Sequence, residues 1–246
     1  MAEYIIAWDL ETIPDLDAAS RLLDIDKADR EQGRAKLGAD FPKLPLHKIV
    51  CIGALVAHRE GNHWAVDALG APHIGQRDET QLIQAFVDKI AELRPRLVTF
   101  NGNSFDLPVL RYRAMVNRIS APGLRARQYF YRYSDDALDL CDALSSFEGR
   151  SKVKLHDLSR MLGLPGKPDG IDGSMVEAFV NEGKIAEVAS YCEADVLNTY
   201  RIWLIYQCFL GQINAAQLAA SEEQLQHFIQ AKRDVAESTK VAAGLN

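Results

Sequence analysis

The sequence predicts one α/β domain built on a mixed β-sheet. Two strongly β-forming runs, residues 3–10 and 49–56, lie early in the chain, and a Gly61-Asn62 turn links the second to another β-forming run. In the later part of the chain, apolar residues recur mostly at the spacing of an α-helix. With 246 residues, no internal repeat and no low-complexity linker, the chain is suited to a single large core.

The first half of the chain should supply most of the sheet. The apolar run at 3–10 predicts a buried strand that ends at a pair of acidic residues. The polar, acidic stretch that follows favours helix, and we expect it to be an insertion packed over the sheet. In order, the expected elements are a strand at 3–10, the insertion at 14–43, hairpin strands at 49–56 and 63–69, an amphipathic helix at 79–93 and a strand at 97–100.

The second half should be mainly helical. Asn101-Gly102-Asn103 predicts a turn before the next helix. The expected elements are a helix at about 107–117, a short strand at 137–140, and helices at 155–162, 174–181, 185–210 and 222–242. We expect residues 1–210 to form the main domain and residues 211–246 to be a helical extension of the same domain.

Composition predicts a cytoplasmic protein. The chain is 48% hydrophobic and 25% charged, which is ordinary for a globular protein. Its start lacks the features of a signal peptide, and no apolar run reaches the length of a membrane span, so no membrane partner is expected. The four cysteines are dispersed and are expected to be reduced core residues.

The charge distribution favours a nucleic-acid partner despite a net charge of −6. Residues 107–134 contain no Asp or Glu, but they contain several arginines interleaved with aromatic residues. Guanidinium groups bind phosphates and aromatic rings stack on unpaired bases, so this stretch suits a single strand. The alternative is that the arginines are the solvated face of a helix and the tyrosines are core.

Four acids and one tyrosine predict a metal site. Asp9 and Glu11 are two apart, which places both on one face of a strand. Tyr191 and Asp195 are four apart, which places both on one face of a helix. Asp106 follows a turn and opens a helix. Gathered carboxylates repel one another unless cations neutralise them, and oxygen ligands without His or Cys favour Mg²⁺ or Mn²⁺.

Each of these residues also has a plain structural interpretation. Asp9 alone could cap a strand end, Asp106 could be the N-cap of its helix, and Tyr191 could be a half-buried core residue. The combination, in this order and in these structural settings, is more specific than any single member.

The chain resembles the DEDD superfamily of 3′–5′ exonucleases, in the branch with tyrosine in the third motif. Three segments carry the resemblance: Asp9-Leu10-Glu11-Thr12, Asn101-Gly102-x-x-Phe105-Asp106-x-Pro108 and Tyr191-x-x-x-Asp195. The second is similar to the proofreading exonuclease of family B DNA polymerases. Overall the chain, from about residue 3 to 203, resembles stand-alone polymerase-B-like exonucleases.

The resemblance implies a ribonuclease-H-like fold and hydrolysis with two Mg²⁺ or Mn²⁺ ions. On this basis Asp9, Glu11 and Asp195 would hold the ion that binds the attacking water. Asp9 would also bridge to the second ion, which Asp106 supports. Tyr191 would orient the water.

The resemblance also implies contacts to the nucleic acid. Thr12 would meet the terminal 3′-hydroxyl, and Asn101 and Phe105 would line the path of the strand, although Phe105 could equally be core. The basic contacts are expected on charge rather than on the resemblance: Arg111 belongs to the stretch without acidic residues, and Lys167 could meet the phosphate backbone or be solvated in its loop.

Other polar residues near these motifs have weaker interpretations. Solvation in a loop is favoured for Lys152 and Lys154, and a structural role is favoured for His47 and His156. A second acidic group should lie outside the ligand set: Asp139 should cap or pair near a strand end, and Asp135 with Asp136 should form a solvated turn.

These features together predict a 3′–5′ exonuclease that acts on single-stranded nucleic acid, DNA rather than RNA, and releases nucleoside 5′-monophosphates. Repair or replication proteins are the expected partners, and the oligomeric state is left open. The alternatives are an exoribonuclease that trims RNA and a nucleic-acid-binding module with weak catalysis.

Overall fold

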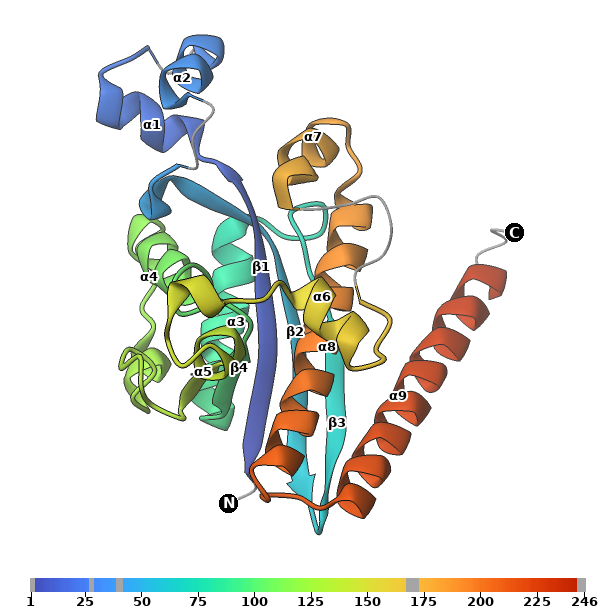
Figure 1. Cartoon of the computed structure of the whole chain (residues 1–246). Helices are drawn as coiled ribbons and strands as arrows, with labels where there is room; N and C mark the ends of the chain where they lie inside the picture. The colour runs from blue at the N-terminus through green and yellow to red at the C-terminus, as the bar shows by residue number, and fades with distance from the viewer. Residues whose placement is uncertain (1–2, 27–28, 39–41, 167–172, 243–246) are drawn as a thin grey trace.

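A five-stranded mixed sheet forms the centre of the computed structural model, which describes residues 3–26, 29–38, 42–166 and 173–242 (Figure 1). The strand order is β3-β2-β1-β4-β5. The first three strands are antiparallel, whereas β4 and β5 run parallel to β1. This confirms the predicted mixed sheet that opens with a hairpin. The strands are β1 (Tyr4–Pro14), β2 (His47–Glu60), β3 (His63–Gly70), β4 (Arg96–Thr99) and β5 (Ala137–Asp139).

Helices cover both faces of the sheet. Helices α3 and α4 pack on one face, and α8 and α9 pack on the other (Figure 1). The described helices are α1 (Leu16–Leu23), α2 (Arg30–Leu37), α3 (Glu79–Leu93), α4 (Asp106–Val116), α5 (Leu140–Leu144), α6 (Leu155–Met161), α7 (Val176–Asn181), α8 (Ile185–Phe209) and α9 (Ala215–Ala242). The expected helix at 79–93 is confirmed. Its apolar spacing marks the face that is buried, and its capping box marks where the helix begins.

Alternation along β1 decides which side chains face which helices. Ile6, Trp8 and Leu10 belong to the core beneath α3 and α4, whereas Ile5 and Ala7 belong to the core beneath α8. Because side chains alternate with a period of two, the next positions on the α8 side are Asp9 and Glu11. The same pattern that buries the strand therefore aims both carboxylates at α8.

Strand β1 is longer than predicted. It runs to Pro14 because β2 continues to pair with it, with Glu11 opposite Cys51 and a bulge between Glu11 and Thr12. Parallel pairing with β4 stops at Ala7. The expectation that the carboxylates stand at a strand end is therefore wrong, although they lie beyond the part of β1 that β4 covers.

The helical insertion is confirmed, but the expectation that it packs over the sheet is wrong. Helices α1 and α2 stand beyond the end of β1 (Figure 1). They contain few buried apolar side chains, such as Ala19, and so have no broad face to lay on the sheet.

A buried ion network fixes the base of this insertion. The guanidinium group of Arg113 on α4 donates to Glu79 at 2.8 and 2.6 Å and to Asp15 at 2.6 Å. Asp15 is the N-cap of α1 and accepts from the amide of Ala18, while Glu79 also accepts from the amide of Ile49. The network thus joins the start of α1 to α3, α4 and β2.

Close packing brings α8 against the sheet at Gly53 of β2. A Cβ atom at that position would lie 2.6 Å from the Sγ atom of Cys192 and 2.9 Å from Cγ2 of Val196. Only glycine therefore permits this approach. It places the middle of α8 directly over the carboxylates of β1.

Helix α9 begins at Ala215 rather than at Glu222 and covers the edge strand β3. The hydroxyl of Ser221 accepts from the amide of Trp64 at 3.0 Å, and Gln224 accepts from the amide of Val66 at 2.8 Å. These bonds satisfy amide groups that an edge strand would otherwise expose. Within the described residues, every helix is too short or too polar to cross a membrane.

Candidate active site

A cleft of about 1160 Å³ lies where β1, α4 and α8 meet. All five predicted catalytic residues line it, and so do Thr12, Asn101 and Phe105. They come from segments far apart in the sequence: Asp9 and Glu11 from β1, Asp106 from the start of α4, and Tyr191 and Asp195 from α8. The fold therefore brings together the residues that the three motifs singled out.

Tyr191 and Asp195 occupy the face of α8 that looks onto β1. Both are buried, and the phenol is hydrogen-bonded to the carboxylate of Asp195. Burial, followed by the negative charges of Asp195, Glu11 and Asp9, raises the pKa of Tyr191 well above its usual range. The phenol is therefore protonated at neutral pH and can donate a hydrogen bond.

Asp106 does not cap its own helix. Phe105 is the N-cap of α4, and the carboxylate of Asp106 instead accepts from the amide of Leu10 at 2.9 Å. Burial raises the pKa of Asp106 to about 7, and its carboxyl group is hydrogen-bonded to that of Asp9. Two carboxyl groups this close favour a shared proton in the absence of a cation. The N-cap interpretation is wrong because the side chain reaches across to β1.

Asp139 holds the turn that precedes α4. One carboxylate oxygen accepts from the amide of Asn101 at 2.7 Å and from Cys141, and the other accepts from the amide of Asn103 at 2.9 Å. The expectation that Asp139 caps near a strand end is confirmed, since it is the N-cap of α5. Its second role, fixing the turn that carries Asn101, was missed because it joins residues 38 apart in the sequence.

The neighbouring acids differ from one another. Asp135 is exposed, as expected for a solvated turn. Asp136 instead accepts from Arg127 at 2.7 Å and from the amide of Gln128 at 3.0 Å. The expectation of a solvated turn is therefore wrong for Asp136, because the chain folds back to pair it with an arginine.

The donor set fits a hard divalent cation. Ligand atoms of Asp9, Glu11 and Cys192 lie within 4.8 Å of one another, and Asp106 and Asp195 line the same cleft. Hydrogen bonding with Cys51 and burial raise the pKa of the Cys192 thiol well above its usual range. A neutral thiol is a poor ligand for Mg²⁺ or Mn²⁺, which prefer oxygen, so the carboxylates remain the candidate ligands.

Thr12 is held by His47 at the wall of the cleft. The Nε2 atom of His47 lies 3.0 Å from the carbonyl oxygen of Pro42, and Nδ1 lies 3.0 Å from the hydroxyl of Thr12. Nε2 must donate to the carbonyl, so Nδ1 accepts from the hydroxyl. The imidazole also meets the ring of Phe105 edge-on at 4.9 Å. These contacts agree with a structural role for His47, and they fix the orientation of Thr12.

The basic residues do not all lie where expected. The guanidinium group of Arg111 sits over the ring of Phe130 at 4.5 Å, away from the lining of the cleft. Lys167 lies outside the described residues. Lys152 lines the cleft and is paired rather than solvated: its Nζ atom lies 2.8 Å from Oδ1 of Asn101. Lys154 and His156 also line the cleft.

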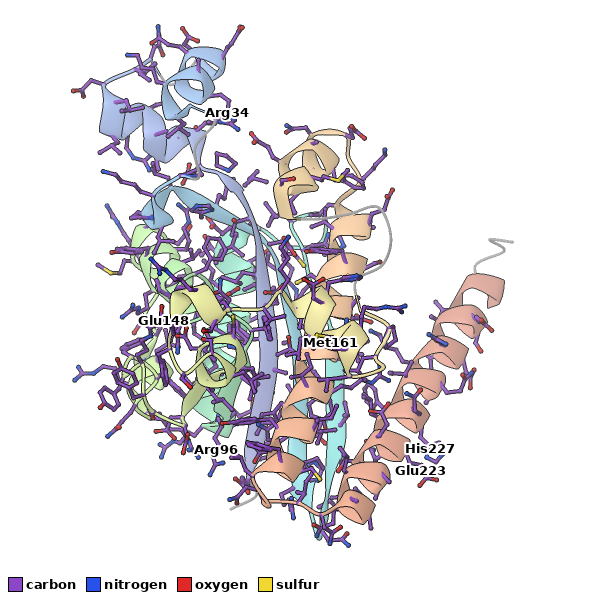
Figure 2. The ribbon with its side chains drawn as sticks, in the orientation of Figure 1. Arg34, Arg96, Glu148, Met161, Glu223 and His227 are labelled. Atoms are coloured by element: carbon purple, nitrogen blue, oxygen red, sulfur yellow. The ribbon has the colours of Figure 1, made fainter. Side chains whose placement is uncertain are left out.

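An ion pair joins two segments of the rim that sequence reasoning did not connect. Arg34 of α2 donates through Nε and Nη2 to the two carboxylate oxygens of Glu177 on α7, each at 3.1 Å. Both residues line the cleft, and Figure 2 shows Arg34 on the side of α2 that faces α7. The two residues are 143 apart in the sequence, and no local pattern signals such a contact.

Comparisons with known proteins point to one family. Residues 39–243 match the family described as "Predicted 3'-5' exonuclease related to the exonuclease domain of PolB". This range includes Asp106, Tyr191 and Asp195 and extends through α9, beyond the resemblance expected from the motifs, and it begins after Asp9 and Glu11.

A solved structure titled "ExoI/SSB-Ct complex" contains a similar chain, at 14% identity and a TM-score of 0.38. The match covers 82% of this chain and 44% of that chain, so this chain spans less than half the length of its structural neighbour. A comparison with curated proteins finds no match. The family match covers most of the sequence, and the chain belongs to the family of predicted 3′–5′ exonucleases related to the exonuclease domain of PolB.

Proposed function

We propose that the protein hydrolyses single-stranded nucleic acid, DNA in preference to RNA, from the 3′ end and releases nucleoside 5′-monophosphates. The observation that carries the proposal is the meeting of four carboxylates and one neutral phenol in a single cleft. The family of the chain supplies the direction of digestion. Residues 211–246 would be a helical extension of the exonuclease domain, which the packing of α9 on β3 supports.

The carboxylates would hold two Mg²⁺ or Mn²⁺ ions. Asp9, Glu11 and Asp195 would hold one ion, and Asp9 with Asp106 would hold the other. When bound, such ions lower the pKa of an attacking water and stabilise the leaving oxygen in an in-line displacement. The hydrogen bond between the carboxyl groups of Asp9 and Asp106 supports this assignment, since two carboxylates this close repel each other and a cation between them would relieve that repulsion.

Tyr191 would orient the attacking water. Its raised pKa keeps the proton on the phenol oxygen, so it would not act as a phenolate base. Its hydrogen bond with Asp195 holds the hydroxyl beside the carboxylates. The contribution of Tyr191 is therefore position, which converts a loosely placed water into one aimed at phosphorus.

The wall of the cleft would receive the terminal nucleotide. Thr12, oriented by His47, would contact the 3′-terminal sugar, and Phe105 would pack against a base or sugar. Asn101 and Lys152, which are hydrogen-bonded to each other, would meet the backbone just upstream. The ammonium group of Lys152 is the cation of this pair and would contact a phosphate.

The rim would favour a single strand over a duplex. The Arg34–Glu177 pair joins α2 to α7 across one side of the cleft. A strand that enters past this pair must be narrow and flexible. A duplex end is wider and stiffer. To enter the cleft, it would have to displace the ion pair, or its terminal base pairs would have to open first.

Digestion of 5′-labelled single-stranded DNA and RNA tests the proposal. With Mg²⁺ or Mn²⁺, the wild-type protein should give a ladder that shortens from the 3′ end, faster on DNA, and EDTA should abolish it. Asp9→Ala should be inactive, whereas Asp88→Ala, which removes an exposed acid on α3, should be active. Absence of digestion with either metal and either strand would overturn the proposal.

A further inference from the structure

An exposed group of aromatic side chains lies beyond the cleft. Phe130, Tyr131, Tyr133 and Phe147 are exposed to 46, 57, 62 and 38%, respectively, whereas Tyr129 of the same segment is 1% exposed and lies in the core. The interpretation of these aromatic residues as core therefore holds for Tyr129 alone. A cluster of large rings in water marks an interaction surface rather than a part of the fold.

Three of these rings form a continuous row. Tyr131 meets Tyr133 at 5.8 Å between ring centroids, and Tyr133 meets Phe147 at 4.7 Å. Glu148, which directly follows Phe147, is labelled in Figure 2 beside α5, on the side of the molecule where α4 lies. The rings are thus exposed and meet one another edge-on, and an exposed aromatic face is a surface on which a base can stack.

The backbone that presents Phe147 is in an uncommon conformation. Ser146 and Phe147 have φ angles of 52° and 63°, the left-handed region that bulky residues avoid. The amide of Phe147 donates to the carbonyl of Asp142 at 2.8 Å, which helps to hold this conformation. Backbone conformations of this cost cluster at functional sites, so the outward placement of Phe147 needs an explanation beyond packing.

Positive charge accompanies the rings. The guanidinium group of Arg132 lies over the ring of Phe147 at 5.6 Å, and that of Arg111 lies over Phe130 at 4.5 Å. Both rings and guanidinium groups offer flat faces for bases, and the guanidinium groups also bind phosphates. The segment 107–134 itself contains no acidic residue, although Asp142 from outside the segment pairs with Arg132.

A chain of contacts links this surface to the cleft. Arg132 pairs with one carboxylate oxygen of Asp142 at 2.9 Å, and Lys152 pairs with the other at 2.9 Å. Lys152 also binds Asn101, and both of these residues line the cleft. The charge of the buried Asp142 is thus opposed by two cations, and a strand leaving the cleft beside Lys152 would next meet Arg132.

We propose that the row formed by Tyr131, Tyr133 and Phe147, together with Arg132, binds unpaired nucleotides on the 5′ side of the same strand whose 3′ end occupies the cleft. Bases would stack on the rings, and phosphates would meet Arg132 and Lys152. The proposal rests on the proposed function and deepens it, since it adds a second contact for long strands. A duplex offers no unstacked base to this surface, and stacking does not depend on the sugar.

Binding of short and long strands to the Asp195→Ala protein, which would not degrade them, tests the proposal. The probes are labelled DNA strands of about 5 and about 20 nucleotides, a range that spans one compact binding site and its surroundings. The long strand should bind more tightly. Replacing Tyr131, Tyr133 and Phe147 by Ala should weaken binding of the long strand about tenfold or more and of the short strand by less than about twofold.

Matched variants separate stacking from damage to the fold. Tyr131→Phe with Tyr133→Phe keeps the rings and should retain long-strand binding. Phe209→Ala removes a ring that is 79% exposed at the end of α8 and should leave both affinities unchanged. If the triple variant does not fold, the single variant Tyr131→Ala, at the outer end of the row, replaces it. It should show a smaller loss of affinity for the long strand.

The outcomes distinguish this inference from the proposed function. Digestion by wild-type protein with no long-strand advantage, or with an advantage that the triple variant retains, would overturn the second contact alone. Equal weakening of short and long strands would also overturn it. A duplex of the same length that binds as tightly as the single strand would exclude stacking. Absence of digestion by wild-type protein would instead count against the proposed function.

Discussion

The inner wall of the cleft and its rim are built in different ways. The wall consists of β1, α4 and α8, whose side chains are buried and whose positions are fixed by sheet pairing, core packing and the bond from Leu10 to Asp106. The rim consists of α2, α7 and the loop that carries Lys152. A partly exposed ion pair joins α2 to α7, and Lys152 pairs with the buried Asp142 of α5. Under the proposed function, the fold would hold the catalytic geometry, whereas side chains that can change partners would control admission of the strand.

The largest effect should follow removal of a carboxylate from the wall. Asp195→Ala should lower the rate of digestion by at least about a thousandfold, because it removes a candidate metal ligand. The fold should survive, since removing one of several repelling carboxylates does not weaken the protein without metal. Rates with Mn²⁺ and thermal unfolding with EDTA measure the two effects. Wild-type activity in this variant would refute the assignment.

Loss of the buried Arg113 of α4 should chiefly lower the stability of the fold. Arg113→Ala leaves Glu79 and Asp15 as unpaired buried charges and should lower the free energy of unfolding by about 3–5 kcal/mol. Arg111→Ala, on the same helix but partly exposed, should cost less than about 1 kcal/mol. Urea denaturation measures both. Similar losses in the two variants would show that the network contributes little.

The close approach of α8 to the sheet can be tested at Gly53. Gly53→Ala places a Cβ atom within 3 Å of Cys192 and Val196, so α8 must shift and the free energy of unfolding should fall by about 1–3 kcal/mol. Activity should fall as well, because α8 carries Tyr191. Gly70→Ala meets nothing within 4 Å and is the matched control. If the denaturation midpoint shifted but activity did not change, the close packing of α8 would not be needed for activity.

A smaller effect is expected from the phenol. Tyr191→Phe should lower turnover about tenfold, since a positioning hydrogen bond is lost while the carboxylates stay. The affinity for Mn²⁺ should not change. Tyr206→Phe, at the far end of α8, controls for loss of a hydroxyl. If Tyr191→Phe lost metal binding together with turnover, Tyr191 would have to act on the ligands rather than on the water.

The smallest effect should come from the rim. Arg34→Ala breaks a partly exposed pair and should change the free energy of unfolding by less than about 1 kcal/mol. Digestion of duplex ends relative to single strands should rise, because the connection between α2 and α7 is lost. Salt should raise the duplex-to-single-strand ratio of wild-type protein towards that of the variant, since salt screens the ion pair. A duplex-to-single-strand ratio equal to that of wild-type protein at low salt would show that the pair does not restrict entry.

The sequence predicted the wall better than the rim. Spacings of two on a strand and four on a helix fix which side chains share a face, so the pairing of Asp9 with Glu11 and of Tyr191 with Asp195 follows from spacing alone. The amphipathic helix at 79–93 was confirmed because its apolar period and capping box are local signals. Both kinds of signal are contained within a few residues of chain.

What the sequence could not supply are contacts between distant segments. The extension of β1 to Pro14 depends on pairing with β2, and the role of Asp106 depends on an amide of β1. The turn held by Asp139 and the Arg34–Glu177 pair likewise join segments with no shared local pattern. The contact of the Arg111 guanidinium group with Phe130 also joins two segments, and the charge of Arg111 alone does not predict it.

The central claim is that carboxylates from β1, α4 and α8 act as one metal-binding unit. Calorimetric titration of Mn²⁺ into the protein with a nucleoside 5′-monophosphate tests it most directly. The wild-type protein and Asp88→Ala should bind two ions per chain. Asp9→Ala should lose both, since Asp9 is the ligand that the two ions would share. Binding of Mn²⁺ by Asp9→Ala with the affinity and stoichiometry of the wild-type protein would contradict the account.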